Sequence, residues 1–402
     1  MSTAEFYEKF HQLLIGNYPS THQIIDSISL KRTISPYIIQ LDKEVLKRSQ
    51  AVIKELYALS RTEEYKKSIA ARDSKTLNNP PPNQSVLMAY DFHTGEESDA
   101  LIEINTNAAM YLIAELLHRT HGDTYDFETP ALVQLKSAFV SEYFQFTGES
   151  NEPQKVVIID ENVKSQNRYI EFLMFKDLFE GWGWDPEVLE FGSLKINEEQ
   201  KALLTPDGQK IDFLYNRFCD FYLSRLESEH LRKAFLHGWC CVSPNPFEYQ
   251  LLADKSRMVE MGSAQFQSQT PQPGERWQIL RQFLLPTYDV STYGCREQLW
   301  ADRKQLFFKP KNQYGGKSVY RGARISKSVF QRALDEDFLV QKYAPAPTPC
   351  LRQTEVSTKD WKFDLRYYVY QDQIQNMVAR LYKGQVTNFS TDFGGFAAVE
   401  FI

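Results

Sequence analysis

The residues from 305 to 322, QLFFKPKNQYGGKSVYRG, combine side-chain types that bind phosphate. A short apolar run leads to Lys309, and the turn Gly315-Gly316-Lys317 precedes a second short strand. Glycines at a tight turn let backbone N–H groups approach an anion, and lysines add point charges that suit phosphate. The stretch has neither the GxxxxGK[ST] nor the GxGxxG spacing, so a surface hairpin with a basic tip is the alternative.

A second polar group lies much earlier in the chain, in residues 86–105. Two short apolar runs flank a polar turn there, which predicts a β-hairpin. Glu103 and Asn105 alternate on its second strand and therefore share a face, and Asp91 at the end of the first strand can reach that face. Two carboxylates and an amide oxygen suit Mg²⁺ that bridges phosphates. The alternative is a polar hairpin whose charged face lies in water.

Two arginines lie on a pair of strands that we predict over residues 363–370 and 376–382. Arg366 and Asp364 share one face of the first strand, and Arg380 points opposite to its apolar neighbours on the second. A short turn joins the strands, so the pattern predicts a hairpin with charged side chains set among apolar ones. An apolar strand over residues 338–343 and an extended segment with alternating prolines come before it.

The middle of the chain, residues 155–245, alternates between strand and helix patterns. Alternation of this kind favours βαβ units on a parallel sheet. Arg217, Asn245 and Lys255 fall near predicted strand ends or loops, where ligands bind open α/β sheets. Taken alone, each of them fits a structural or solvated role better than a functional one.

The first 78 residues have a helical apolar spacing, with leucines and valines recurring at three- and four-residue intervals. The following run Asn79-Pro80-Pro81-Pro82-Asn83 breaks a helix and predicts a linker. The helical segment is therefore expected to end before the acidic hairpin.

Composition bounds the class of protein. The chain has 402 residues, is 42% hydrophobic and carries a net charge of −6, so we expect a folded chain of two or three packed units. The acidic balance argues against a nucleic-acid-binding protein, and no apolar run is long enough for a membrane span. Five cysteines without metal spacing and the lack of a secretory signal predict a cytoplasmic protein with reduced thiols.

Together these segments resemble the ATP-grasp superfamily, in particular circularly permuted members such as glutathionylspermidine-synthetase-like carboxylate–amine ligases. FFKPKNQYGGKSVYRG looks like the lysine and the phosphate-covering loop of that family, and FLVQKYAP looks like its adenine-contacting hinge. FDLRYYVYQDQIQNMVARLYKGQVTNFS is similar to its basic strands. YDFHTGEESDALIEIN resembles the acidic strand pair that normally follows those strands, and a circular permutation explains its early position.

The resemblance implies a mixed α+β and α/β architecture. Two α+β lobes would hold ATP, beside a Rossmann-like substrate domain and a helical N-terminal segment. The expected boundaries are a helical segment over 1–85, the metal-binding part of the permuted ATP-grasp over 86–150, the substrate domain over 151–247 and the ATP-grasp lobes over 248–402.

The implied activity is an ATP- and Mg²⁺-dependent ligase that forms a C–N bond between a small-molecule or peptide carboxylate and an amine, through an acyl phosphate. A homodimer is left open. An ATP-grasp kinase and a catalytically inactive nucleotide-binding protein are the alternatives. By this resemblance the expected ATP contacts are Lys309, Lys311, Gly315, Gly316, Lys317, Gln341, Lys342, Tyr343 and Asn388; the Mg²⁺ ligands are Asp91, Glu103 and Asn105; the catalytic arginines are Arg366 and Arg380; and His93 and Arg217 bind substrate carboxylates.

Overall fold

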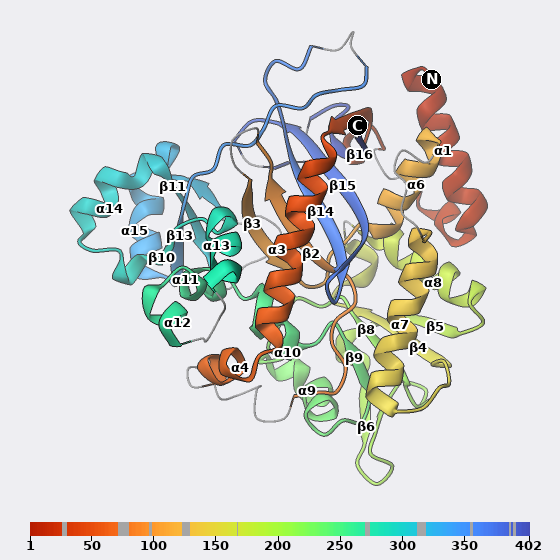
Figure 1. The fold of residues 1–402 in the computed structure, drawn as a ribbon. Helices are drawn as coiled ribbons and strands as arrows, with labels where there is room; N and C mark the ends of the chain where they lie inside the picture. Colours follow the sequence, from red (N-terminus) through yellow and green to blue (C-terminus); the bar gives the residue numbers. More distant parts are fainter. Residues whose placement is uncertain are drawn as a thin grey trace.

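A computed structural model gives the fold of the chain (Figure 1). It describes residues 1–25, 30–70, 80–95, 99–122, 129–166, 168–269, 274–311, 319–353, 357–385, 387–388 and 391–402. The described strands form a six-stranded sheet, two four-stranded sheets and one two-stranded sheet. None of the helices in these ranges is long and apolar enough to cross a membrane.

The six-stranded sheet joins distant parts of the sequence. Its order is β1-β16-β15-β14-β2-β3, and every neighbouring pair is antiparallel except β1 with β16. The predicted acidic hairpin is β2 with β3, and the predicted arginine hairpin is β14 with β15; the two hairpins lie side by side because β2 pairs with β14. The strands are β1 (Ile34–Leu41), β2 (Met88–His93), β3 (Ala100–Asn105), β14 (Trp361–Tyr370), β15 (Gln373–Lys383) and β16 (Gly395–Phe401).

Helices cover both faces of this sheet. Alternate residues of β14 point to opposite faces, so Leu365 and Tyr367 enter one core while Tyr368 enters the other. α3 (Lys43–Arg61) runs across the first face, and its N-terminus is capped by Asp42, whose side chain accepts from the Glu44 N–H. The other helices around the sheet are α1 (Thr3–Asn17), α2 (Leu30–Thr33), α4 (Glu63–Ala70), α6 (Tyr111–His121) and α13 (Gly274–Phe283).

The sequence pattern predicted a helical N-terminal segment, but the structure contains a strand within it. Residues Ile34–Leu41 form β1, which pairs in parallel with β16 at the edge of the large sheet. Ile34, Ile38 and Ile39 are β-branched and fully or almost fully buried, and Pro36 has no N–H to give to a helix. This segment therefore forms a strand buried against a distant partner, although its local spacing of apolar residues fits a helix.

The predicted parallel α/β unit is present. Its four strands follow the order β5-β4-β8-β9, and all neighbours are parallel. The strands are β4 (Lys155–Asp160), β5 (Asp185–Glu190), β8 (Phe213–Asn216) and β9 (Cys241–Ser243), and the small hairpin is β6 (Lys195–Asn197) with β7 (Ala202–Leu204). The helices around them are α7 (Ala131–Thr147), α8 (Tyr169–Gly181) and α9 (Glu229–Leu236).

A small lobe is built on the third sheet, in the order β10-β13-β11-β12. Leu306, Phe308 and Val340 point to one face of this sheet and form a core of their own with α15. The lobe contains β10 (Thr287–Asp289), β11 (Leu306–Pro310), β12 (Tyr320–Arg321), β13 (Phe338–Lys342), α14 (Arg296–Asp302) and α15 (Lys327–Asp335).

Short helices connect the α/β unit to the small lobe. They are α10 (Pro246–Glu248), the π-helix η6 (Tyr249–Ala253), α11 (Ser256–Met261) and α12 (Ala264–Gln269). Further 3₁₀ turns occur at Pro19–Gln23, Val163–Ser165, Phe191–Ser193, Leu226–Ser228, Val290–Thr292, Arg303–Gln305 and Gly322–Arg324.

Candidate active site

Charged side chains of opposite sign meet on one face of the large sheet. Asp91 on β2 lies between Glu103 on β3 and Arg366 on β14 in the strand register. Arg366 donates from Nε and Nη2 to the two oxygens of Asp91, both at 2.7 Å, and Arg380 donates from Nη2 to Asp91 Oδ2 at 2.8 Å. Sheet pairing alone therefore brings together the acidic and basic hairpins that the sequence separates.

This cluster is held in a fixed arrangement. Arg380 also donates to Asp364 on the neighbouring strand, and Thr387 donates its hydroxyl to the other oxygen of that carboxylate, each at 2.5 Å. Asp91 is fully buried, and burial alone would raise its pKa, but the guanidinium groups of Arg366 and Arg380 outweigh burial and hold the pKa below its usual value. The carboxylate is therefore charged at neutral pH and orients two arginines.

Lys309 reaches the same region from the small lobe. It lies on β11 opposite Leu339, on the sheet face away from the core of the lobe. Its Nζ donates to the Ile102 carbonyl oxygen of β3 at 3.0 Å and to Gln341 Oε1 at 2.7 Å. Burial lowers the pKa of Lys309 to about 8, although the nearby Glu103 carboxylate raises it. The lysine thus bridges the small lobe and the acidic strand.

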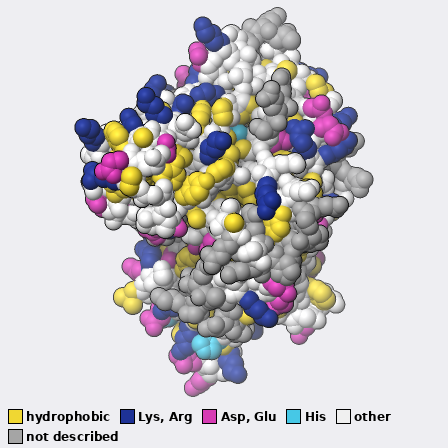
Figure 2. All heavy atoms as spheres, turned by 60° about the vertical axis from the view of Figure 1, so that its left-hand side comes forward, with side chains coloured by type: hydrophobic (Ala, Val, Ile, Leu, Met, Phe, Trp, Pro, Cys, Tyr) yellow, Lys and Arg dark blue, Asp and Glu magenta, His cyan; other side chains and the backbone are white. Residues whose placement is uncertain are grey.

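A narrow pocket lies between the small lobe and β3. β3 contributes the polar side chain of Glu103, and the small lobe contributes Lys309 and Gln341. Asp254 and Lys255, which follow the π-helix, add two charged side chains. Its lining residues are Ile102, Glu103, Ile104, Leu252, Ala253, Asp254, Lys255, Met258, Lys309, Leu339 and Gln341. In Figure 2 hydrophobic side chains gather on the side of the molecule where the small lobe meets the rest of the chain, and Lys and Arg side chains stand among them.

Asp254 and Lys255 were not assigned to this site from the sequence, where Lys255 was only placed near a loop. Lys255 donates from Nζ to the Pro310 carbonyl oxygen at the end of β11, at 3.1 Å. Burial lowers its pKa, while Glu103 and Asp254 raise it. The only sequence signal was an Asp-Lys pair directly before a short helix, which is too common to indicate a site.

The acidic residues fit a hard cation to different degrees. Glu103 offers a carboxylate to the pocket, and Asn105 on the same strand offers an amide oxygen, which are ligand types that Mg²⁺ accepts. Asp91 fits less well, because its oxygens already accept from Arg366, Arg380 and, at 3.4 Å, from Asn105 Nδ2. Within the described ranges, no three or more His, Cys, Asp or Glu side chains gather into a metal-binding group.

The predicted hinge residues lie at the end of β13. Gln341 is buried and faces the pocket, where its Oε1 accepts from Lys309. The N–H groups of Lys342 and Tyr343 donate to the carbonyl oxygens of Pro286 and Gln305, at 2.8 and 2.7 Å. A nucleobase would therefore have to use other groups of this segment in the arrangement seen here.

Other predicted residues lie outside the pocket lining. Lys311 forms ion pairs with Asp289 and Asp337. Asn388 donates to the Lys383 carbonyl oxygen and accepts from Thr391, so it holds the turn after β15. The turn Gly315-Gly316-Lys317 lies outside the described residues.

Both side chains predicted to bind substrate contact backbone carbonyl oxygens of the protein itself. His93 contacts the Ala344 carbonyl oxygen through Nδ1 at 3.0 Å, and burial lowers the pKa of this imidazole. Arg217 is buried; it donates to the Ala108 carbonyl oxygen at 2.9 Å and lies 3.7 Å from Glu171. Arg217 thus ties the α/β unit to the loop that follows Glu103 and Asn105.

Comparisons with known proteins agree with this architecture. Residues 244–393 match the model of the Tubulin-tyrosine ligase family. A glutathione synthetase like-effector (GSS30) from Globodera pallida, in the apo form, superposes with a TM-score of 0.57 over 92% of this chain and 90% of that chain, at 10% identity. The chain has the ATP-grasp fold. The fold class predicted from the sequence is thereby confirmed, while the circular permutation and the domain boundaries stay predictions.

A second solved structure shows the same similarity of fold. The putative gamma-glutamylcysteine synthetase from Methylobacillus flagellatus KT superposes with a TM-score of 0.51 over 91% of this chain and 90% of that chain, at 8% identity. No curated protein sequence matches the chain. The ATP-grasp assignment therefore rests on the family match and on similarity of fold.

Proposed function

We propose that the chain is an ATP- and Mg²⁺-dependent ligase that joins a carboxylate to an amine. The observation that carries this proposal is the pocket between the small lobe and β3, where Lys309 and Lys255 face Glu103. Lysines suit the phosphates of a nucleotide, and a carboxylate beside them suits the cation that accompanies those phosphates. The ATP-grasp fold supports the same reading.

Each residue has a distinct role in this proposal. Lys309 and Lys255 bind the phosphates of ATP. Gln341, near the end of β13, lies on the side of the nucleobase. Glu103 and Asn105 would hold Mg²⁺, which would supply positive charge to offset the charge of the phosphates. Asp91, which we expected to be a metal ligand, instead orients the two arginines through its hydrogen bonds.

Arg366 and Arg380 place positive charge beside the reacting groups. A substrate carboxylate oxygen attacks the γ-phosphorus, the bond to the β-phosphate oxygen breaks, and ADP and an acyl phosphate result. The amine then attacks the acyl carbon, phosphate leaves, and the amine loses a proton as the amide forms. Fixed guanidinium groups stabilise the charge that develops in both steps, because they are already oriented before the reaction.

The order of strands also favours a circular permutation of the ATP-grasp lobes. The acidic hairpin β2–β3 precedes the arginine hairpin by a long stretch of chain, yet it extends the same sheet directly beyond β14. We keep the boundaries expected from the sequence, with the α/β unit as the substrate domain over 151–247. A peptide or a small molecule can supply the carboxylate.

The test combines nucleotide binding with product formation. Calorimetry with MgATP should show binding to the wild-type protein and a higher dissociation constant for Lys309→Met. A panel of amino acids, polyamines and short peptides, followed by mass spectrometry, should then show ADP release that depends on both a carboxylate and an amine.

Three outcomes would overturn the proposal. ADP release with phosphorylation of a single hydroxyl substrate would indicate a kinase. MgATP binding with no turnover across the panel would indicate a nucleotide-binding protein. Full turnover by Glu103→Gln would remove that residue from the metal role.

A further inference from the structure

The π-helix η6 leads directly into the nucleotide pocket. Its residues Leu252 and Ala253, together with Asp254 and Lys255, which follow it, line the pocket. A π-helical turn is rare and needs support from its surroundings, since its hydrogen-bond spacing differs from that of an α-helix. What holds this turn therefore also determines where Lys255 lies.

Two side chains of the N-terminal helices hold the π-helix. Arg61, the last residue of α3, donates from Nη1 and Nη2 to the two oxygens of Glu248, both at 2.7 Å. Glu248 is buried and immediately precedes η6. Tyr65 of α4, which is also fully buried, donates its hydroxyl to the Leu251 carbonyl oxygen inside η6 at 2.5 Å.

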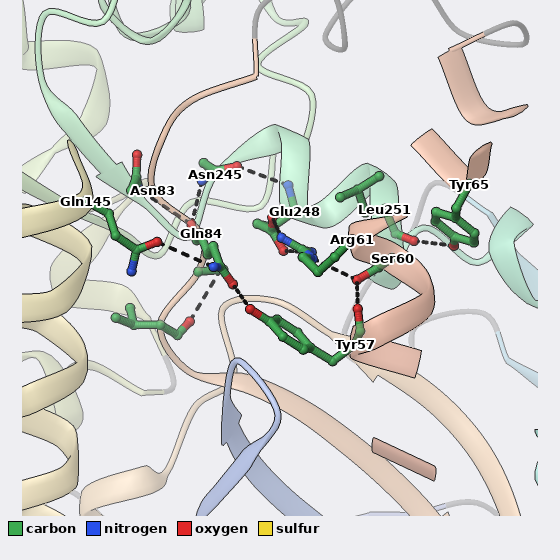
Figure 3. A network of polar contacts seen from close by, with 12 residues as sticks. Tyr57, Ser60, Arg61, Tyr65, Asn83, Gln84, Gln145, Asn245, Glu248 and Leu251 are labelled. Atoms are coloured by element: carbon green, nitrogen blue, oxygen red, sulfur yellow. Dashed lines mark hydrogen bonds and ion pairs between the residues drawn. The ribbon is translucent and has the colours of Figure 1, made fainter. Parts of the chain in front are cut away.

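Figure 3 shows these contacts as parts of one network. Asn245 caps the segment: its Oδ1 accepts from the Glu248 N–H at 3.0 Å, and its Nδ2 donates to the Gln84 carbonyl oxygen at 2.5 Å. Tyr57 on α3 donates to Gln84 Oε1 at 2.9 Å. The Tyr57 hydroxyl thus contacts Gln84 and not residues 248–255, while the Tyr57 ring lies 5.0 Å from the Arg61 guanidinium, a contact that phenylalanine would keep.

We propose that Arg61 and Tyr65 are positioning residues for Lys255, so that the N-terminal helices set the affinity of the pocket for nucleotide phosphates. The buried, two-pronged Arg61–Glu248 pair fixes the start of the π-helix, and the Tyr65 hydroxyl fixes its middle. Lys255 follows after a few residues and has its Nζ on the Pro310 carbonyl oxygen. This inference rests on the proposed function, because it assumes that Lys255 contacts phosphate.

The test is a double-mutant cycle on MgATP affinity, measured by calorimetry. Tyr65→Phe removes one hydroxyl and should raise the dissociation constant roughly two- to tenfold, the range expected for one hydrogen bond. Tyr57→Phe, a matched control on the neighbouring turn of the same network, should leave it unchanged. In a Lys255→Ala background, Tyr65→Phe should have no further effect, because the residue that it positions is gone.

Specific results would overturn the inference. An equal effect of Tyr65→Phe with and without Lys255 would show general destabilisation, and no effect in either background would show that the contact does not position the lysine. If Tyr65→Phe fails to fold, Arg61→Lys gives the same cycle, since it keeps the charge but loses the two-pronged contact. Absence of MgATP binding by the wild-type protein would overturn the proposed function and this inference with it, whereas wild-type binding with an additive cycle overturns the inference alone.

Discussion

Replacing Asp91 with asparagine should destabilise the protein strongly, although the change in size is minimal. Asp91 is fully buried and accepts three hydrogen bonds of 2.7, 2.7 and 2.8 Å from two guanidinium groups. The amide removes the negative charge and leaves Arg366 without a carboxylate partner among the described residues, whereas Arg380 keeps Asp364. Removing one partner of a buried ion pair costs about 3–5 kcal/mol, and we expect a loss in that range.

The matched control is Glu103→Gln, the same chemical change at the residue opposite Asp91 in the register. Glu103 lines the pocket, so its substitution should change the free energy of unfolding by less than about 1 kcal/mol. Chemical denaturation of both variants, with the midpoint and slope fitted separately, measures the difference. Wild-type stability in Asp91→Asn, or an equal loss in both variants, would refute the assignment of Asp91 to the arginines.

The pH dependence gives a second check on Asp91. Its pKa is lower in the folded than in the unfolded protein, despite burial, because two guanidinium groups contact it. A group with a lowered folded pKa stabilises the fold above its unfolded pKa, and this contribution is lost as the pH falls through the folded pKa. The stability gap between wild type and Asp91→Asn should therefore be full at neutral pH and close only below about pH 4.

Three further predictions concern other titratable or charged groups. Burial lowers the pKa of Lys309 to about 8, so about half of the free protein carries an uncharged lysine near pH 8. MgATP binding should therefore take up roughly half a proton, which calorimetry in buffers of different ionisation enthalpy measures. Lys309→Met should reduce this uptake. Burial raises the pKa of Glu142 to about 7, so the folded state favours the neutral acid, and the free energy of unfolding falls as the pH rises from about 4.5 to 7. In urea unfolding, the free energy of unfolding of Glu142→Gln should rise by about 2–3 kcal/mol relative to that of the wild type between pH 4.5 and 8. Arg380→Lys should lower turnover at saturating substrate by at least about tenfold with a nearly unchanged MgATP dissociation constant, because lysine lacks the planar guanidinium whose Nε and Nη2 contact Asp364 and Asp91 separately. An unchanged rate would remove Arg380 from the reaction.

The sequence predicted the local elements of the site well. Both hairpins that carry Asp91, Glu103, Arg366 and Arg380 are present, and the strand with Lys309 lies where its apolar pattern indicated. Period-2 alternation is a local property, so it can be read without knowing the neighbours of a strand. Glu103 and Lys309 line one pocket, and Asp91 contacts Arg366 and Arg380; the roles expected of these residues stay predictions.

What the sequence did not reveal depends on long-range pairing. The contacts of Asp91 could not be inferred from the sequence, because they depend on the pairing of β2 with β14, which supplies Arg366. β1 and β16 were missed for the same reason, as each is stabilised by the other and not by a local partner. Lys255 was not assigned because its place in the pocket comes from the π-helix, whose unusual spacing leaves no periodic signal.

The pairing of β1 with β16 has a consequence for the order in which the molecule assembles. Gln40 and Glu400 contact each other although they are 360 positions apart, and Asp91 and Arg366 are 275 positions apart. By contrast, the four strands of the parallel α/β sheet all lie between residues 155 and 243. Contacts between distant residues form slowly, and locally closed units fold first. During refolding, the α/β unit should gain protection from hydrogen exchange before the arginine–carboxylate cluster does, so the candidate site becomes native after the α/β unit.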